Sequence, residues 1–308
     1  MTLLPWICMV SALHSLFILI YMELIIGILG NEFITLLNFM DWVKMQKISL
    51  AHQILTALAI SRICLILMLM VSYFTKEFYP SLYMTTKKVT IIDTAATLAN
   101  HFSTWLATSL SLFYCLKIAS FSNPLFLHLK HRVKRVILVI FLGSFMFLPF
   151  YFIAITKCVN IQIYPHKGNM TLASIWNDNE KFSKLISFTL GVLIPFSLTL
   201  NCFFLLIFSL RKHVKNMKLN ATGFRDHSTR VHIRAMKFVV LFLLLFIIYF
   251  LSVIIITFNT IKIQRKVMLM LLRAFAALYP SGHTLILILG NGKLRKSFLL
   301  VLWRLRCR

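Results

Sequence analysis

The sequence predicts an all-α membrane protein: a bundle of seven transmembrane helices, with the N-terminus outside the cell and the C-terminus inside. Of the 308 residues, 59% are hydrophobic and only 13% are charged, and a soluble domain with this balance does not cover its own surface with polar groups. The hydrophobic residues come in long runs and do not alternate with polar ones, which favours helices over a β-barrel. The lysines and arginines gather in alternate connections between these runs, which fixes the orientation.

The runs predict seven spans, because a helix needs about 20 apolar residues to cross the hydrocarbon core of a bilayer. We expect them at residues 7–29, 54–74, 90–116, 136–156, 185–210, 238–261 and 267–290. The third span is the most polar, and the fourth to the sixth are nearly free of charge. Residues 1–308 then form a single seven-transmembrane domain, and no separate soluble domain is expected.

The distribution of lysine and arginine residues predicts the orientation of the chain in the membrane and its partners. With the N-terminus outside, the inner connections carry 21 lysines and arginines and the outer ones carry 10. A formal net charge of +25 would suggest nucleic acid as the partner of a soluble protein. In a membrane protein such charge serves topology and contact with anionic lipid headgroups. We therefore expect membrane lipids as partners, and no nucleic acid.

The sequence carries no pattern typical of an enzyme. The six cysteines lie far apart, without the spacing of metal ligands or of a disulfide framework. There is no nucleophile elbow, phosphate-binding loop or pair of catalytic carboxylates. We expect no catalytic residue, no metal site and no cofactor.

The longest outer loop, at about 157–184, contains the sequon Asn169-Met-Thr, where a glycan can be attached. A second sequon at Asn220 lies inside under this topology and is expected to stay bare. Three prolines, Pro149, Pro195 and Pro280, fall within spans. Such prolines mark kinks in membrane helices, which suit a receptor or a transporter that adopts two packings.

Five runs identify a family. Residues 105–124, WLATSLSLFYCLKIASFSNP, resemble the third helix and second inner loop of the type 2 (bitter) taste receptors. Similar matches follow in the family's order at residues 30–42, 54–63, 224–237 and 279–294. The resemblance implies a G-protein-coupled receptor of the plasma membrane. It also implies that small bitter compounds bind in the outer half of the bundle and that a gustducin-type heterotrimeric G protein is activated.

The chain departs from the family pattern at three places. It has His227 where the family often has proline, Thr284 where serine is common, and no tryptophan around Leu67 in the second helix. The first two are expected to alter inner-face contacts little, and the third to change ligand preference. The chain also lacks the Asp-Arg-Tyr and Asn-Pro-x-x-Tyr signatures of rhodopsin-like receptors.

The resemblance places the ligand among the outer halves of the third, fifth, sixth and seventh helices. We expect Asn100 to be its main polar contact, because a neutral amide both donates and accepts hydrogen bonds. Tyr249 either repacks on activation or packs in the core without signalling. The other residues expected in this site are Ala96, Thr97, His101, Ser187, Phe188, Ser252, Arg273 and Ala276, with Asp93 at its outer edge.

Arg273 supports a sharper hypothesis about the ligand. A partly desolvated guanidinium binds carboxylates in a bidentate manner, so Arg273 would favour acidic agonists. Two alternatives stay open: a structural Asp93–Arg273 pair, and an arginine that snorkels outward.

Arg62 is an ionisable residue within a span, and such residues are functional candidates. We expect it to pair with polar groups of the first and seventh helices, for which Asn31 and His283 are the natural suggestions. It is either a structural clamp or a moving part of the activation switch, and the two roles are compatible.

Tyr114 and Lys117 are three residues apart and so share a helix face at the inner end of the third helix. The resemblance puts them in the place of the Asp-Arg-Tyr element, in contact with the G protein; the alternative for Lys117 is a lysine that snorkels to the lipid interface. Lys237 and His283, with Arg62, complete the residues expected to act in activation and coupling.

Two rival functions stay open at this point. A type 1 vomeronasal receptor shares the gross plan but not the runs around residues 113–122 and 283–291. A small transporter or channel would need acidic groups at mid-depth, and the central spans have almost none.

Overall fold

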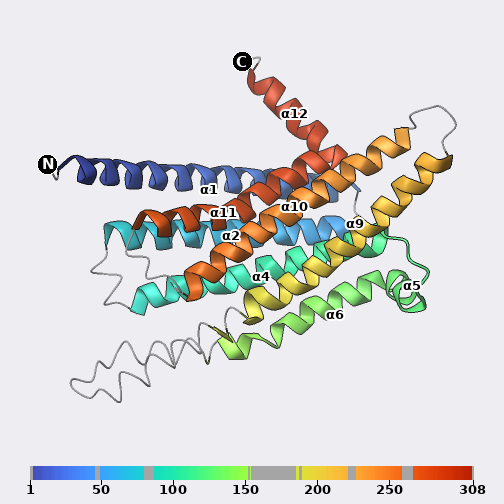
Figure 1. Ribbon diagram of the computed structural model, residues 1–308, viewed down its shortest axis with the longest axis horizontal. Helices are drawn as coiled ribbons and strands as arrows, with labels where there is room; N and C mark the ends of the chain where they lie inside the picture. Colours follow the sequence, from blue (N-terminus) through green and yellow to red (C-terminus); the bar gives the residue numbers. More distant parts are fainter. Residues whose placement is uncertain are drawn as a thin grey trace.

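The computed structural model describes residues 3–45, 49–79, 87–151, 153, 185–186, 189–220, 227–258 and 266–306. Within these ranges the chain is helical, and the long helices lie side by side along one axis (Figure 1). They are α1 (Leu3–Met45), α2 (Leu50–Phe78), α4 (Lys87–Ile118), α6 (Val133–Phe145), α9 (Ile194–Asn220), α10 (His227–Phe258) and α11 (Lys266–Gly290). The shorter elements are α5 (Pro124–His131), the π-helix η1 (Thr189–Leu193) and α12 (Gly292–Arg306).

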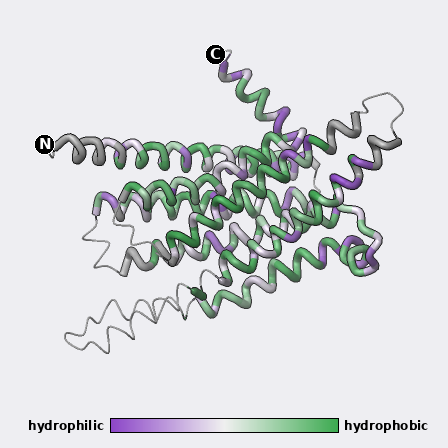
Figure 2. The backbone as a smooth tube through the Cα atoms, in the orientation of Figure 1, coloured by the Kyte–Doolittle hydropathy of each residue, from purple (hydrophilic) through white to green (hydrophobic). Residues whose placement is uncertain are grey.

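Successive long helices run in opposite directions, so the N-terminus lies at one end of the bundle and α12 begins at the other (Figure 1). Hydrophobic residues cover the long helices, and hydrophilic ones gather at the end that carries α5 and the start of α12 (Figure 2). The predicted fold class, an all-α membrane bundle, is confirmed. We call the end of the bundle with α5 and α12 the inner end.

The most polar predicted span forms the helix with the most neighbours. In the part of the chain that the structure describes, six helices are long and apolar enough to cross a membrane, and α4 is not among them. It packs against α2, α6, α9 and η1, and its middle is buried. Its hydroxyls donate to its own carbonyls, as Ser109 Oγ does to Trp105 O at 2.9 Å. A helix surrounded by protein does not have to be apolar towards lipid, which explains its composition.

Helix α1 continues beyond residue 29 because its later polar groups have partners within the bundle. Asn31 and Asn38 are buried, and Asn38 Nδ2 donates to Thr56 Oγ1 of α2 at 3.0 Å. An asparagine that is paired inside a bundle does not end a membrane helix.

The three prolines have different effects on their helices. Two short turns follow α6 at Met146 and Phe147 before the helical residues 148–151, which contain Pro149. The π-helix η1 ends just before α9, whose second residue is Pro195. Pro280 lies within α11, which stays helical to Gly290.

Candidate functional site

Arg62 of α2 is the centre of a buried polar cluster. Its side chain is 0% exposed, and Nη1 lies 2.8 Å from Nδ1 of His283 and 3.3 Å from Oγ1 of Thr284, both on α11. Its guanidinium carbon is 5.3 Å from the centre of the Tyr279 ring. A guanidinium only donates, so Nδ1 of His283 accepts and the imidazole is neutral. The structure thus brings Arg62 to His283, as predicted.

Asn31 reaches this cluster through Thr284 and not by contacting Arg62 itself. The Thr284 hydroxyl lies 3.0 Å from Asn31 Oδ1, and Asn31 Nδ2 donates to Gly27 O at 2.7 Å. The direct Asn31–Arg62 pair suggested by the sequence is therefore corrected to a relay. Thr284 has the hydroxyl that a serine would also supply, which explains why this departure from the family pattern leaves the cluster intact.

Small residues let α1 approach α11 closely at this level. A Cβ placed on Gly27 would lie 2.9 Å from Cβ of Ser281 and 2.9 Å from Cδ1 of Ile66. A Cβ on Gly30 would lie 3.1 Å from Cγ2 of Thr284. Such close approach is typical of small residues in membrane interfaces, and it brings the polar groups of the two helices within hydrogen-bond distance.

An aromatic layer lies against the Arg62 cluster. The Tyr279 ring is 5.5 Å from the His283 ring, 5.1 Å from Phe246 and 4.9 Å from Tyr249. Tyr249 Oη donates to Asn100 Oδ1 at 2.9 Å. The layer therefore connects α4, through α10 and α11, to the guanidinium on α2. It also brings together Asn100 and Tyr249, which the sequence analysis expects in one site.

Threonines of α4 contact the irregular start of α9. Pro195 has no N–H to donate to Gly191 O one turn earlier, and the Thr104 hydroxyl lies 3.0 Å from that carbonyl. One turn along α4, Thr108 Oγ1 lies 2.9 Å from Thr199 Oγ1 and 3.3 Å from Pro195 O. These contacts hold the π-helical segment against α4.

The structure separates the other residues expected to bind the ligand. His101 is buried towards α6, with Nδ1 3.2 Å from Tyr151 Oη, so it points to a different side of α4 from Asn100. Arg273 lies with its guanidinium carbon 5.4 Å from the centre of the Tyr73 ring. Ser252 is buried and donates to Ile248 O at 2.8 Å, and Ala276 packs at the edge of the main core.

Some of the residues expected at the ligand site have few described contacts or lie outside the described ranges. Ala96 and Thr97 are half-buried one turn before Asn100. Ser187, Phe188 and the sequon residue Asn169 lie outside the described residues, as does the side chain of Asp93. The proposed Asp93–Arg273 pair therefore stays a prediction.

At the inner end, Tyr114 belongs to a hydrophobic cluster that joins three helices. The cluster includes Cys202 and Leu206 of α9, with Met236 and Val239 of α10 packed on it. Lys117 and Lys237 are exposed beside it. Tyr114 and Lys117 are thus both at the inner end, one packed between helices and the other open to a partner.

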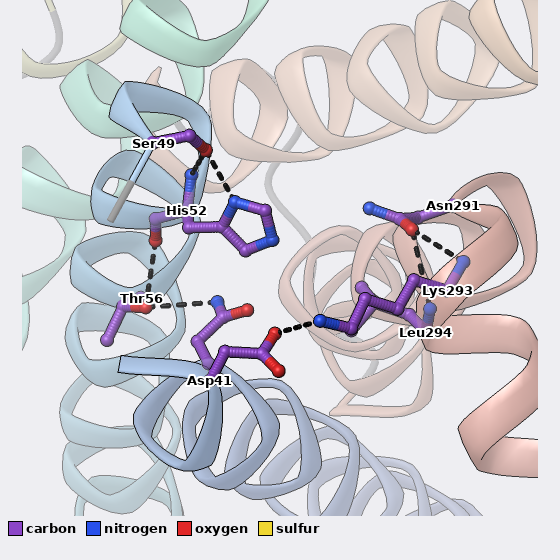
Figure 3. Close-up of polar contacts among 8 residues, drawn as sticks. Asp41, Ser49, His52, Thr56, Asn291, Lys293 and Leu294 are labelled. Atoms are coloured by element: carbon purple, nitrogen blue, oxygen red, sulfur yellow. Dashed lines mark hydrogen bonds and ion pairs between the residues drawn. The ribbon is translucent and has the colours of Figure 1, made fainter. Parts of the chain in front are cut away.

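A polar rim completes the inner end of α1, α2 and α12. Figure 3 shows Asp41 of α1 pointing towards Lys293 of α12, and Lys293 Nζ lies 2.5 Å from Asp41 Oδ2. Asn291 Oδ1 accepts from the backbone N–H groups of Lys293 and Leu294 at 3.0 and 3.3 Å, which caps the start of α12. The rim fixes where α12 leaves the bundle.

Sequence reasoning missed two of these contacts. Thr104 and Thr108 lie in the third predicted span, the most polar one, and no contact is expected of them from the sequence; their one-turn spacing was an available signal. The Asp41–Lys293 pair had no signal beyond opposite charges at the ends of two predicted helices. Across the described ranges, no group of three or more His, Cys, Asp or Glu side chains is placed to hold a metal ion.

The comparisons of this sequence with known proteins agree on one family. The sequence model described as taste receptor protein (TAS2R) matches residues 9–306. Taste receptor type 2 member 140 of Rattus norvegicus is 45% identical over 294 residues, which cover 95% of this chain and 94% of the relative. Putative taste receptor type 2 member 33 of Homo sapiens is 45% identical over 289 residues, which cover 94% of this chain and 93% of that one.

A solved structure agrees on the fold. The crystal structure of squid rhodopsin superposes with a TM-score of 0.57 and covers 96% of this chain and 87% of that one. The two sequences are 17% identical, so this likeness shows the fold alone.

Proposed function

The chain belongs to the TAS2R family of taste receptors, seven-helix receptors of the plasma membrane, and on that premise we propose that it detects small bitter compounds and activates a gustducin-type G protein. The agonist binds in the outer half of the bundle and shifts the receptor towards a packing with an open inner cavity. Such a shift requires that the agonist bind the two packings with different affinities.

The Asn100–Tyr249 hydrogen bond is the observation that carries the proposal. It links α4 to α10 at 2.9 Å, and the Tyr249 ring lies 4.9 Å from Tyr279, which in turn faces Arg62. An agonist that takes the Asn100 amide competes with Tyr249 for it. Tyr249 then repacks against Tyr279, and the change reaches the Arg62–His283 contact between α2 and α11.

The inner end supplies the coupling surface. Movement of α10 away from α4 would separate Met236 and Val239 from the Tyr114 cluster and expose Tyr114 to the C-terminal helix of a G-protein α subunit. Lys117 and Lys237 are exposed at the same end. Their positive charge complements an acidic partner surface and raises the rate of encounter.

The remaining expected residues shape the ligand site in this proposal. Ala96 and Thr97 extend the Asn100 face of α4 outward, Ser252 and Ala276 continue it on α10 and α11, and Ser187 and Phe188 contribute from the fifth predicted span. His101 contributes through its contact with Tyr151, and Asn169 carries a glycan in the outer loop. Arg273 retains two roles to be tested: selection of acidic agonists, and pairing with Asp93.

A calcium-mobilisation assay with a gustducin-chimera α subunit tests the proposal. We expect at least one compound of a bitter panel to evoke a response, and we expect Tyr114→Ala to abolish it at equal surface expression. Tyr79→Ala is the matched control, because Tyr79 is an exposed tyrosine at the outer end of α2. A response that survives Tyr114→Ala contradicts the coupling surface. Ligand-driven flux without a G protein contradicts the receptor function.

The ligand site is tested in the same assay. Asn100→Leu keeps the size of the side chain and removes the amide, so we expect the half-maximal agonist concentration to rise about tenfold, which corresponds to about 1.4 kcal/mol. Asn201→Leu is the control, since Asn201 is an exposed asparagine whose amide donates only along its own helix, to Ser197 O at 2.8 Å. For Arg273→Gln, responses to acidic and to neutral agonists that are both the same as in the unaltered chain contradict the selection of acidic compounds by Arg273.

A further inference from the structure

Helices α4 and α9 meet along a seam of small polar side chains that keeps one register. Thr104 Oγ1 lies 3.0 Å from Gly191 O, and Thr108 Oγ1 lies 3.3 Å from Pro195 O. In both contacts the residue numbers of the two partners differ by 87. A constant difference means that the two helices run in the same direction, so the same pairing is expected to continue towards the inner end.

A pair of cysteines lies on this seam near the inner end. Cys115 of α4 and Cys202 of α9 differ in number by the same 87, and their thiols are hydrogen-bonded to each other. Both are free thiols, buried in the cluster against which Tyr114 packs. Just beyond them, Ser120 N–H donates to Ser209 Oγ at 3.0 Å. The fold thus brings together two cysteines that lie far apart in the sequence, and holds the helices together on both sides of them.

Two thiols in contact across a helix seam have the arrangement that disulfide formation requires. The bond joins the two sulfur atoms directly and adds no atom between them, so the pair needs no cavity beside it. Formation of the bond also requires a thiolate, because the thiolate is the reactive form of cysteine.

The surroundings of the pair favour a thiolate. Ala119 N–H donates to Cys115 O at 2.9 Å, and Ala119 O accepts from Lys130 Nζ at 3.0 Å. An ammonium group therefore lies one helical turn from Cys115, and a nearby positive charge stabilises a thiolate. The partner thiol adds to this effect, because a hydrogen bond donated to the charged sulfur also favours it.

We propose that Cys115 and Cys202 are a site of reversible oxidation, at which hydrogen peroxide forms a disulfide between α4 and α9. The first thiolate attacks the O–O bond of the peroxide; an S–O bond forms, and the leaving hydroxide takes up a proton to become water. The second thiol then attacks this sulfenic acid; the S–S bond forms, and the S–OH group leaves as a second water. The two sulfurs lose two electrons in total, which reduce the peroxide.

The position of the pair suits a reversible reaction. The inner end faces the cytosol, where disulfides are mostly transient and serve to sense redox conditions. Cellular thiols then restore the pair by thiol–disulfide exchange.

The disulfide would restrain the part of the bundle that couples to the G protein, a consequence that rests on the proposed function. Cys115 directly follows Tyr114, and Cys202 belongs to the cluster that has to separate for Tyr114 to be exposed. A covalent link between α4 and α9 holds one side of this cluster in its resting packing. The oxidised receptor is therefore shifted away from the packing with an open inner cavity.

Peptide mapping of the purified full chain in lipid nanodiscs tests the site without agonist or G protein. The chain is treated with hydrogen peroxide, its remaining thiols are alkylated under denaturing conditions, and the proteolytic peptides are analysed by mass spectrometry. We expect a disulfide-linked peptide pair that contains Cys115 and Cys202 and that disappears after treatment with dithiothreitol. Alkylation of both cysteines after peroxide treatment overturns the proposal, and so does a link from either one to another cysteine.

Thermal unfolding of the same sample measures the restraint. A disulfide that closes a long loop stabilises the folded chain, so we expect peroxide to raise the unfolding midpoint by about 4 °C. Cys115→Ser and Cys202→Ser should each abolish the rise. Cys64→Ser is the matched control and should retain it, because Cys64 is an exposed free cysteine on α2. A rise that persists in Cys115→Ser overturns the proposal, as does a midpoint that stays unchanged when the linked peptide has formed.

Agonist responses separate this inference from the proposed function. In the calcium-mobilisation assay, brief peroxide treatment should lower the maximal response of the unaltered chain and of Cys64→Ser by at least about twofold. It should lower the response of Cys202→Ser less. Equal losses in all three chains overturn the control of coupling by this pair. A chain that never responds, whether reduced or oxidised, contradicts the proposed function instead and leaves the result of the peptide mapping unaffected.

Discussion

The two halves of the bundle that meet at Tyr279 are built in different ways. On one side, α1, α2 and α11 are held by close packing at Gly27 and Gly30 and by the relay of Arg62, Thr284 and Asn31. On the other side, α9 and α10 meet through large aromatic rings, α4 joins α10 through the hydrogen bond between Asn100 and Tyr249, and α4 joins the start of α9 through its threonines. We call them the close-packed half and the aromatic half.

The difference predicts where the receptor changes shape. Glycine contacts at the limit of van der Waals distance leave no room for a second packing, because interiors at this density respond to small shifts with large costs. Aromatic rings slide and tilt at lower cost, and a π-helical turn, η1, leads into α9 just before Pro195. We infer that the close-packed half is the fixed frame and that the aromatic half moves against it.

The largest expected effect comes from filling the closest contact in the frame. In Gly27→Leu the new Cβ meets Ser281 Cβ at 2.9 Å, and Ser281 is fixed to the backbone of α11. We expect the free energy of unfolding to fall by about 3 kcal/mol or more, measured by thermal unfolding of the chain in nanodiscs. Gly143→Leu is the control, with no atom within 4 Å of its new Cβ. Equal effects at the two glycines would contradict the idea of a tightly packed frame.

Removal of the relay hydroxyl has a smaller effect in the same half. Thr284→Val keeps the shape of the side chain but leaves Asn31 Oδ1 and one donor direction of Arg62 without their partner. We expect a loss of about 1 to 3 kcal/mol of unfolding free energy, the cost of buried polar groups left unpaired. Thr75→Val is the control, because it removes a solvent-exposed hydrogen bond from the Thr75 hydroxyl to Val71 O within α2. We expect it to change the free energy of unfolding by less than about 0.5 kcal/mol. The reverse order would show that the relay is not formed in the folded receptor.

The sequence predicted those features of the two halves that depend on single residues or on known runs, but not the contacts that depend on how the helices are rotated and crossed. The fold class, and Arg62 with His283, followed from hydropathy, from a charge within a span and from the family resemblance, since each is a property of residues or of known runs. The relay through Thr284 did not, because which of several polar groups meets a guanidinium depends on the rotation of α11. Asn100 and Tyr249 were both expected in one site, but their direct hydrogen bond depends on the crossing of α4 and α10, which no local pattern encodes.

The aromatic half is tested by a change that should alter signalling more than stability. Tyr249→Phe keeps the ring stacked on Tyr279 but removes its hydrogen bond to Asn100. We expect the free energy of unfolding to fall by about 0.5 to 1.5 kcal/mol. Asn100 no longer has Tyr249 as a competitor for the agonist, so the half-maximal agonist concentration should fall by about threefold to tenfold. Tyr79→Phe serves as the control, and an unchanged or higher agonist requirement in Tyr249→Phe would contradict the role of this bond in the resting state.

The smallest effect is expected at the inner rim, where the frame meets α12. Asp41 and Lys293 are 29% and 60% exposed, so water and salt screen their attraction, and exposed pairs contribute about 0.2 to 1 kcal/mol. Asp41→Asn and Lys293→Met, combined in a double-mutant cycle on unfolding free energy, should give a coupling in that range that shrinks at high salt. A coupling of several kcal/mol that persists at high salt would mean that the pair is shielded as well as Arg62 is, and that the fixed frame extends to α12. A weak coupling instead leaves α12 held mainly by the Asn291 cap and by its junction with α11, free to adjust when a G protein binds beside it.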